Sequence, residues 1–345
     1  MDSNIERTQN ENRLIAQPNA SYAENVRNQT RGKKDHLQDG ETSSHGTSDI
    51  SGISDKKNIR GTRPMLTLVI AFYNKIDYLK LIFASLETQT MTDFEVIIAD
   101  DGSRPEIQQQ LHELTSKVTF PVLHLWQEDL GFRKNRMLNW AIHHARADYM
   151  VFIDADCVLH PEFLREHFEH RVKNSILAGR RMDLNAWVTG LLTVEKIRQG
   201  FLWKNYFWIA LVVSYMKDNN APKGIYIPER SRFSWLSSLK KYLRRLVNRK
   251  PREVVGCNFS CFREDLLKVN GFDTRFTMVS FGEDSEIEFR MKLAGIQTIP
   301  FCNTAVQYHL YHKVLPRPEG ALQLFLESKQ RAQAVTDHGL QQMLG

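Results

Sequence analysis

Two carboxylates one residue apart, Asp154 and Asp156, directly follow the short apolar run 149–153. A run of this length is typical of a buried strand, so both side chains are expected at the end of a strand. There they can jointly face Mg²⁺ or Mn²⁺, because such cations prefer oxygen ligands and commonly bind through one or two carboxylates plus substrate phosphates. Asp-x-Asp by itself is a weak signal, since solvated turns carry the same pattern.

Polar residues also follow two other apolar runs of the sequence. The run 65–72 ends at Tyr73, and the run 94–99 leads into Asp101. Helical patterns lie between and after these runs, at about 77–88, 105–116 and 134–145. Strands that alternate with helices predict a doubly wound, mostly parallel α/β sheet, in which ligands bind beyond the carboxyl ends of the strands. Tyr73 and Asp101 should therefore meet the aspartate pair at one edge of this sheet.

The composition is that of a soluble globular protein: of 345 residues, 42% are hydrophobic and 25% are charged, with a formal net charge of +6. No stretch approaches the roughly 20 apolar residues needed to span a bilayer, and the longest candidate, 206–216, is interpreted as a core or interfacial helix. The N-terminus lacks an apolar signal region, and the four cysteines are too scattered for a disulfide framework. A cytoplasmic location is therefore expected.

Several motifs in this order resemble family 2 glycosyltransferases of the GT-A fold. Within residues 65–185 the matching stretches are 68–74, 94–103 and 152–156. Residues 256–295 resemble the C-terminal segment shared by galactosyltransferases and chondroitin-type polymerases, through 256–260, 269–273 and 282–284. The two regions together cover about half of the chain, and the order and spacing of their motifs make the resemblance specific.

The resemblance implies a role for each residue at the strand ends. Ala71 and Tyr73 would lie against the base of a nucleotide sugar, with the tyrosine ring as a stacking face. Asp101 would accept a hydrogen bond from the base, as a carboxylate can from an imide N–H. Asp154 would lie near the ribose and the donor sugar, and Asp156 would ligate the metal. Threonine or proline is common in the family where this chain has Ala71, so only its backbone could contribute.

The stretch 127–136 resembles the loop that precedes a helix in this family. A glycine-containing loop that opens a helix and carries Arg133, Lys134 and Arg136 suits a diphosphate or sugar hydroxyls. A basic, solvated helix start is the alternative interpretation. Arg133 and Arg136 are the two residues assigned to donor binding.

Glu283 and Asp284 follow Gly282 at the start of a predicted helix. The helix dipole favours acidic residues in a first turn, but it does not explain four acids within six residues. The resemblance makes Asp284 the general base that deprotonates the acceptor hydroxyl, with Glu283 orienting the acceptor. Proton abstraction by a positioned carboxylate fits direct displacement with inversion at the anomeric carbon.

In the resembling families, a histidine after a late strand, expected here at 304–308, completes the metal shell. His309 and His312 both follow this strand, and His309 is the preferred ligand. Imidazole is a tolerable ligand for Mn²⁺ and a poor one for Mg²⁺, so the expected cofactor is Mn²⁺ or Mg²⁺. A purely structural histidine is the alternative.

Residues 185–252 interrupt the alternation of strands and helices. From Arg230 to Arg252 the chain is rich in Lys and Arg and contains no Asp or Glu, and within 231–250 apolar and basic residues fall on opposite helix faces. The segment could lie on an anionic membrane surface, dock an anionic acceptor, or pack as an ordinary helix. Its place between the donor and acceptor motifs favours membrane or acceptor contact. Nothing else resembles a nucleic-acid module, so no nucleic-acid partner is expected.

The predicted domain organisation follows from these segments. Residues 1–62 are polar, without a hydrophobic period, and are expected to be disordered. Residues 63–345 are expected to form one GT-A domain. Its parts are a nucleotide-binding half at 63–184, a helical basic insertion at 185–252, an acceptor and catalytic half at 253–315, and a C-terminal helix at 316–345.

The leading interpretation is an inverting, metal-assisted glycosyltransferase. It would move a hexose from a nucleotide sugar, a UDP-sugar before a dTDP-sugar, to a surface glycan or glycolipid such as lipopolysaccharide, at the inner face of a membrane. A sugar-1-phosphate nucleotidyltransferase is an alternative, although residues 71–74 lack the Gly-rich loop with a basic residue expected there. A non-catalytic carbohydrate- or membrane-binding protein is another, but it would not need both the aspartate pair and Glu283-Asp284.

Overall fold

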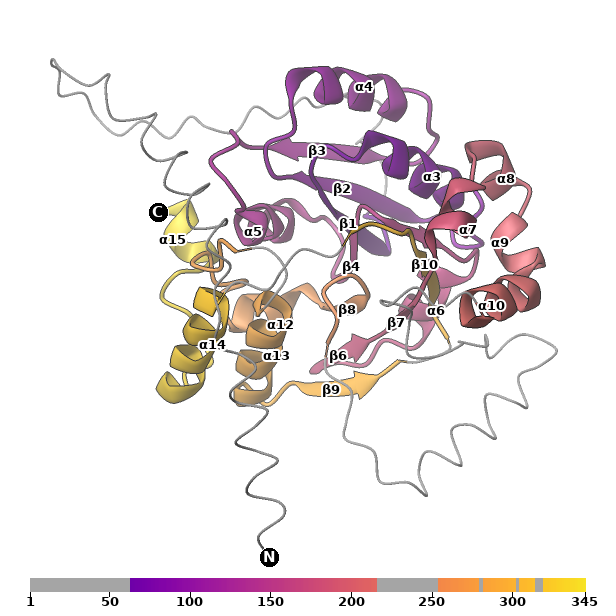
Figure 1. Cartoon of the computed structure of the whole chain (residues 1–345). Coiled ribbons are helices and arrows are strands. Elements are labelled where there is room, and N and C mark those ends of the chain that lie inside the picture. The colour runs from indigo at the N-terminus through magenta and orange to yellow at the C-terminus, as the bar shows by residue number, and fades with distance from the viewer. Residues whose placement is uncertain (1–62, 216–253, 279–281, 302–303, 314–318) are drawn as a thin grey trace, which may run out of the picture. The chain divides into compact units, whose positions relative to one another are not determined.

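The computed structural model describes residues 63–215, 254–278, 282–301, 304–313 and 319–345 (Figure 1). The segment 1–62, predicted to be disordered, and the basic segment 231–250 lie outside the described residues. Among the helices that are described, none is long and apolar enough to cross a bilayer.

A seven-stranded sheet organises this part of the chain, in the strand order β3-β2-β1-β4-β8-β6-β9 (Figure 1). Four neighbouring strands are parallel: β1 (Leu66–Phe72), β2 (Phe94–Asp100), β3 (Val122–Trp126) and β4 (Tyr149–Asp154). Antiparallel pairing occurs around β8 (Phe259–Phe262), which joins β4 to β6 (Ser175–Ala178), and β6 is parallel to β9 (Gln297–Pro300). The prediction of a mostly parallel, doubly wound α/β sheet is confirmed.

Helices cover both faces of the sheet, which explains why β1 and β2 are apolar along nearly their whole length. One face packs against α3 (Ile76–Leu86), α4 (Pro105–Thr115) and α6 (Phe163–Glu169). The other face packs against α5 (Lys134–His144), α12 (Arg263–Lys268) and α13 (Glu283–Leu293). Helices α5 and α13, which come from the two halves of the chain, therefore share one face.

A second, three-stranded sheet lies beyond the end of β4. Its strand order is β5 (Cys157–Leu159), β10 (Val306–His309) and β7 (Arg180–Asp183). The register places His309 opposite Cys157 on one side and opposite Asp183 on the other. The pairing in this small sheet therefore places His309 close to the aspartate pair Asp154 and Asp156.

The insertion predicted at 185–252 begins with four short helices. They are α7 (Ala186–Gly190), α8 (Val194–Arg198), α9 (Phe201–Lys204) and α10 (Tyr206–Tyr215). Strand β8 begins at Phe259 because the chain before it turns: the backbone N–H of Asn258 donates to the Val255 carbonyl at 2.9 Å.

The C-terminal segment, expected as one helix, contains two: α14 (Glu319–Arg331) and α15 (Leu340–Leu344). The chain between them turns back onto the segment before α13. There the Thr336 hydroxyl donates to Asp273 Oδ2 at 3.0 Å, and the Thr274 N–H donates to the His338 carbonyl at 2.9 Å. These contacts require a break in the helix.

Candidate active site

Asp101 follows β2 and holds the loop that leads into α5. The Gln127 amide donates to Asp101 Oδ1 at 2.6 Å, and the backbone N–H of Arg133 donates to Oδ2 at 2.7 Å. Burial raises the pKa of Asp101 to about 6, although these two donors act to lower it. The carboxyl group therefore changes its charge slightly below neutral pH.

Tyr73 follows β1 and lies beside the same loop. Its hydroxyl donates to Asp129 Oδ2 at 2.9 Å, while 47% of the residue remains exposed. The loop approaches closely because residue 102 is a glycine with a φ of +96°, where a Cβ would lie 2.6 Å from Asp129 Cα. An exposed ring next to a buried carboxylate offers a stacking face and a hydrogen-bond acceptor, the two contacts that the predicted base-binding role requires.

Ala71 and Asp154 are direct partners in the β1–β4 ladder, so both lie at the edge that carries Tyr73 and Asp101. The Ala71 carbonyl accepts the backbone N–H of Ala155 at 3.0 Å. Tyr73, Asp101 and Asp154, which were predicted to meet at the carboxyl ends of the strands, thus share that edge.

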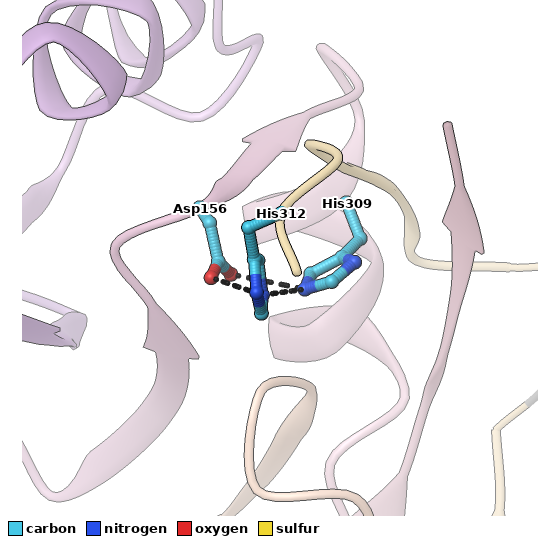
Figure 2. A group of neighbouring side chains, drawn as sticks. All are labelled: Asp156, His309 and His312. Atoms are coloured by element: carbon cyan, nitrogen blue, oxygen red, sulfur yellow. Dashed lines mark hydrogen bonds and ion pairs between the residues drawn. The ribbon is translucent and has the colours of Figure 1, made fainter. Parts of the chain in front are cut away.

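Asp156, His309 and His312 form a compact cluster just beyond β4 (Figure 2). One ligand atom from each residue lies within 4.8 Å of the others. His309 Nε2 lies 3.4 Å from Asp156 Oδ1, His312 Nε2 lies 3.2 Å from Oδ2, and the two Nε2 atoms are 3.3 Å apart. The preferred histidine and its alternative are therefore both brought to the same carboxylate.

Asp183 fixes the orientation of the His309 ring from behind. Its Oδ1 lies 3.1 Å from His309 Nδ1 and is itself paired with Arg181 Nε at 2.8 Å. A carboxylate on Nδ1 holds a proton at that nitrogen, so when a cation replaces the proton on Nε2, the His309 ring would present its Nε2 lone pair beside Asp156 and His312. This tautomer is the one a metal ligand requires.

We expect Asp183→Asn to weaken Mn²⁺ binding by about 10- to 100-fold, because the His309 ring loses its carboxylate partner. The affinity would be measured by electron paramagnetic resonance of free Mn²⁺, with no substrate present. Arg181→Met is the matched comparison, since it removes the outer partner of Asp183 but keeps the carboxylate; a larger loss in Arg181→Met than in Asp183→Asn would contradict the role given to Asp183.

The electrostatics of the cluster keep Asp156 ionised. Burial would raise the pKa of Asp156, but the hydrogen bond from His312 and the charges of His309 and Lys75 outweigh it and hold the pKa well below its usual range. Lys75 Nζ lies 3.2 Å from Asp156 Oδ2. One carboxylate and two imidazoles fit Mn²⁺ better than Mg²⁺, and three protein ligands leave open positions for phosphate oxygens.

Lys134 connects this edge to the start of α13. Its Nζ lies 2.8 Å from Asp154 Oδ1 and 3.8 Å from Glu283 Oε1. Burial is the main cause that raises the pKa of Glu283, and Lys134 opposes this shift. Glu283, distant in sequence, is therefore close to Asp154.

Asp284, the predicted base, is held by backbone donors. The Gly256 N–H donates to its Oδ2 at 2.9 Å, and the Ser285 N–H donates to its Oδ1 at 2.8 Å. Each carboxylate oxygen has a second lone pair, so both can still accept a proton or a hydrogen bond from a substrate hydroxyl.

The two arginines that were predicted to bind the sugar donor are Arg133, at the end of the loop before α5, and Arg136, in the first turn of α5. The Arg133 guanidinium donates to the Glu128 carbonyl, and its backbone N–H is the one that bonds to Asp101. Arg136 is half-buried, and its Nε has no hydrogen-bond partner among the described residues. Their contact with a diphosphate stays a prediction.

Residues 67–186 match the family model described as glycosyl transferase family 2, and residues 246–313 match the one described as the N-terminal domain of galactosyltransferase. Residues 67–186 thus form a glycosyltransferase family 2 region, and a galactosyltransferase-like segment follows it. Together with the mostly parallel sheet, this match confirms the expected GT-A fold class.

Two named relatives are polymer-forming enzymes. The chondroitin synthase of Escherichia coli is 26% identical over 235 residues, which are 67% of this chain and 32% of the relative. The chondroitin synthase of Pasteurella multocida (strain Pm70) is 25% identical over 257 residues, 72% of this chain and 25% of the relative. The chain thus spans about a third or less of the length of these curated relatives.

Among solved structures, a mannosyltransferase from Pyrobaculum calidifontis, PcManGT, in complex with GDP-Man and Mn²⁺ aligns with a TM-score of 0.46 and 14% identity. The alignment covers 79% of this chain and 70% of that one.

The sequence patterns gave no specific role to Lys75, Lys134 or Asp183. Lys134 was noted only as part of a basic loop, and Lys75 directly follows the first strand motif without standing out. Asp183 reaches the cluster through the pairing of β7 with β10, which are distant in sequence. A local sequence pattern cannot predict that two distant strands pair in this way.

Proposed function

We propose that this family 2 glycosyltransferase is an inverting enzyme that transfers a hexose from a UDP-sugar to a glycan or glycolipid acceptor. The convergence of three groups supports the proposal: the base-binding pair Tyr73 and Asp101, the candidate metal cluster around Asp156, and the acids Glu283 and Asp284. The names of the two chondroitin synthases are consistent with a glycan acceptor.

In this reaction the acceptor hydroxyl gives its proton to Asp284 while its oxygen bonds to the anomeric carbon and the bond from that carbon to the nucleoside diphosphate breaks. Glu283 orients the acceptor, and Asp154 holds the donor sugar beside it. A divalent cation held by Asp156, His309 and His312 would supply positive charge opposite the departing diphosphate.

A donor screen tests this proposal directly. UDP- and dTDP-hexoses would be incubated with Mn²⁺ or Mg²⁺, and the released nucleoside diphosphate measured. We expect a UDP-hexose to turn over, and faster with Mn²⁺ because two of the three candidate ligands are imidazoles. Product with a retained anomeric configuration, seen by NMR, would exclude inversion. Pyrophosphate release from UTP and a sugar 1-phosphate would favour a nucleotidyltransferase, and no turnover of any donor would favour a binding protein.

We expect the affinity for uridine to fall as the pH drops through about 6. The pKa of Asp101 is raised to about 6 by burial, so the carboxylate that accepts the imide N–H is present above this pH and protonated below it. Uridine is the suitable probe, because it carries no phosphate that titrates in this range. In NMR titrations at several pH values, Asp101→Asn should bind uridine more weakly than the wild type, and its affinity should not change with pH. A pH dependence in this variant equal to that of the wild type would contradict the assignment.

A peripheral membrane contact through 231–250 stays a prediction, since that segment lies outside the described residues. It is proposed from the basic, amphipathic sequence alone. Co-sedimentation of the whole protein with anionic and neutral vesicles would test it, and equal recovery with both would contradict an electrostatic contact.

A further inference from the structure

Lys134, the first residue of α5, buries its ammonium between carboxylates from two separate parts of the chain. Asp154 ends β4 on the donor side, at 2.8 Å, and Glu283 begins α13 on the acceptor side, at 3.8 Å. Only 15% of the Lys134 side chain is exposed. A single cation thus contacts both sides of the site.

Mutual charge stabilisation keeps this arrangement together. Burial alone would lower the pKa of Lys134, but Asp154, Glu283 and Asp284 raise it above its usual range. A buried charge without a partner is costly. Removal of the ammonium would therefore leave three neighbouring carboxylates that repel one another. Two of them, Glu283 and Asp284, belong to the first turn of α13.

The rest of α5 attaches to the chain ahead of α13. Asn135 Nδ2 donates to the Asp273 carbonyl, and Asn139 Nδ2 donates to the Phe272 carbonyl, both at 2.8 Å. Among the ion pairs of the described residues, Lys134–Glu283 is the one that joins the first turn of α13 to the donor side.

We propose that Lys134 is a positioning residue that holds the first turn of α13, and with it the base Asp284, against the donor-side aspartates. The identities of the two sides rest on the proposed function. Misplacement of a catalytic group by about 1 Å can cost about 100-fold in rate, so a small movement of this turn is enough to matter. The Arg variant keeps the charge at this place, whereas a Met variant keeps the length of the side chain without the charge.

Amide hydrogen exchange in the peptide 282–290 measures the position of this turn without any acceptor. In Lys134→Met we expect exchange about tenfold faster at these amides, with exchange in β1 and β2 unchanged. Lys134→Arg should restore exchange to within about threefold of the wild type. Lys292→Met is the matched control, because Lys292 pairs with Glu288 on the same helix at 2.7 Å but lies outside the site; it should exchange like the wild type.

Kinetics and binding give the second readout. The affinity for UDP in the presence of Mn²⁺ should stay within about threefold of the wild type in all variants. The kcat for a UDP-hexose, measured as released UDP, should fall about 100-fold in Lys134→Met and recover in Lys134→Arg. Unchanged exchange in Lys134→Met, or equally fast exchange in Lys292→Met, would overturn the proposal. If the wild type releases no UDP from any donor, the proposed function fails, and the exchange experiment still decides the role of Lys134.

Discussion

Asp156→Asn is expected to reduce metal-dependent release of nucleoside diphosphate at least about 1000-fold. Asp156 supplies the anionic ligand in a cluster whose other candidate ligands, His309 and His312, are imidazoles. Without that charge, Mn²⁺ would be held by two neutral rings, and Lys75 close by would oppose the cation. Both Mn²⁺ affinity and the turnover of a UDP-hexose should therefore fall.

The fold should survive this substitution. An asparagine has the same shape and can still form hydrogen bonds to the histidines. The melting temperature and the circular dichroism spectrum would check this. Asp148→Asn is the matched control, because Asp148 is exposed next to the start of β4 and pairs with Arg63 at the surface. Near wild-type turnover in Asp156→Asn at saturating Mn²⁺ would rule out the metal role.

The edge of the sheet could be predicted from the sequence because its elements are local and regular. Uninterrupted apolar runs identify parallel strands that are buried on both faces, and the residue after each run must lie at the carboxyl edge. Tyr73, Asp101 and Asp154 follow from this rule alone. Their roles as base and donor contacts came from the resemblance to glycosyltransferases, and they stay predictions.

The connections across the site could not be predicted in the same way. The choice between His309 and His312 depends on the course of the chain after β10, which brings both rings to Asp156. The ion pair of Lys134 with Glu283 depends on the packing of α5 and α13 on one face of the sheet. Such contacts arise from tertiary packing between segments that are distant in sequence, and local sequence periodicity does not indicate which segments pack together.

The basic loop also contacts carboxylates of the chain itself. The Arg133 backbone N–H bonds to Asp101, and Lys134 neutralises carboxylates, while the contact of Arg133 and Arg136 with a diphosphate stays a prediction. Positive charge in a loop predicts that an anion is near; it does not distinguish a substrate phosphate from an aspartate of the chain itself.

Asp284→Asn is expected to lower the rate of nucleoside diphosphate release by about 100- to 10,000-fold, the range typical for loss of a positioned general base. The amide cannot take up the proton of the acceptor hydroxyl, while the residues predicted to bind the base, Tyr73 and Asp101, are untouched. Initial rates with a UDP-hexose and Mn²⁺ would measure the loss, and the affinity for UDP with Mn²⁺ should remain within about threefold of the wild type.

A second variant separates lost chemistry from local distortion. Both Asp284 oxygens accept backbone N–H groups, from Gly256 and Ser285, and an asparagine must turn its NH₂ group toward one of these donors. This mismatch could cost about 1–3 kcal/mol on its own. Asp284→Glu keeps both acceptor oxygens on a longer arm, so it should retain more activity than Asp284→Asn. Equal loss in both variants would point to distortion of the turn, whereas wild-type rates in Asp284→Asn would assign the base to another residue.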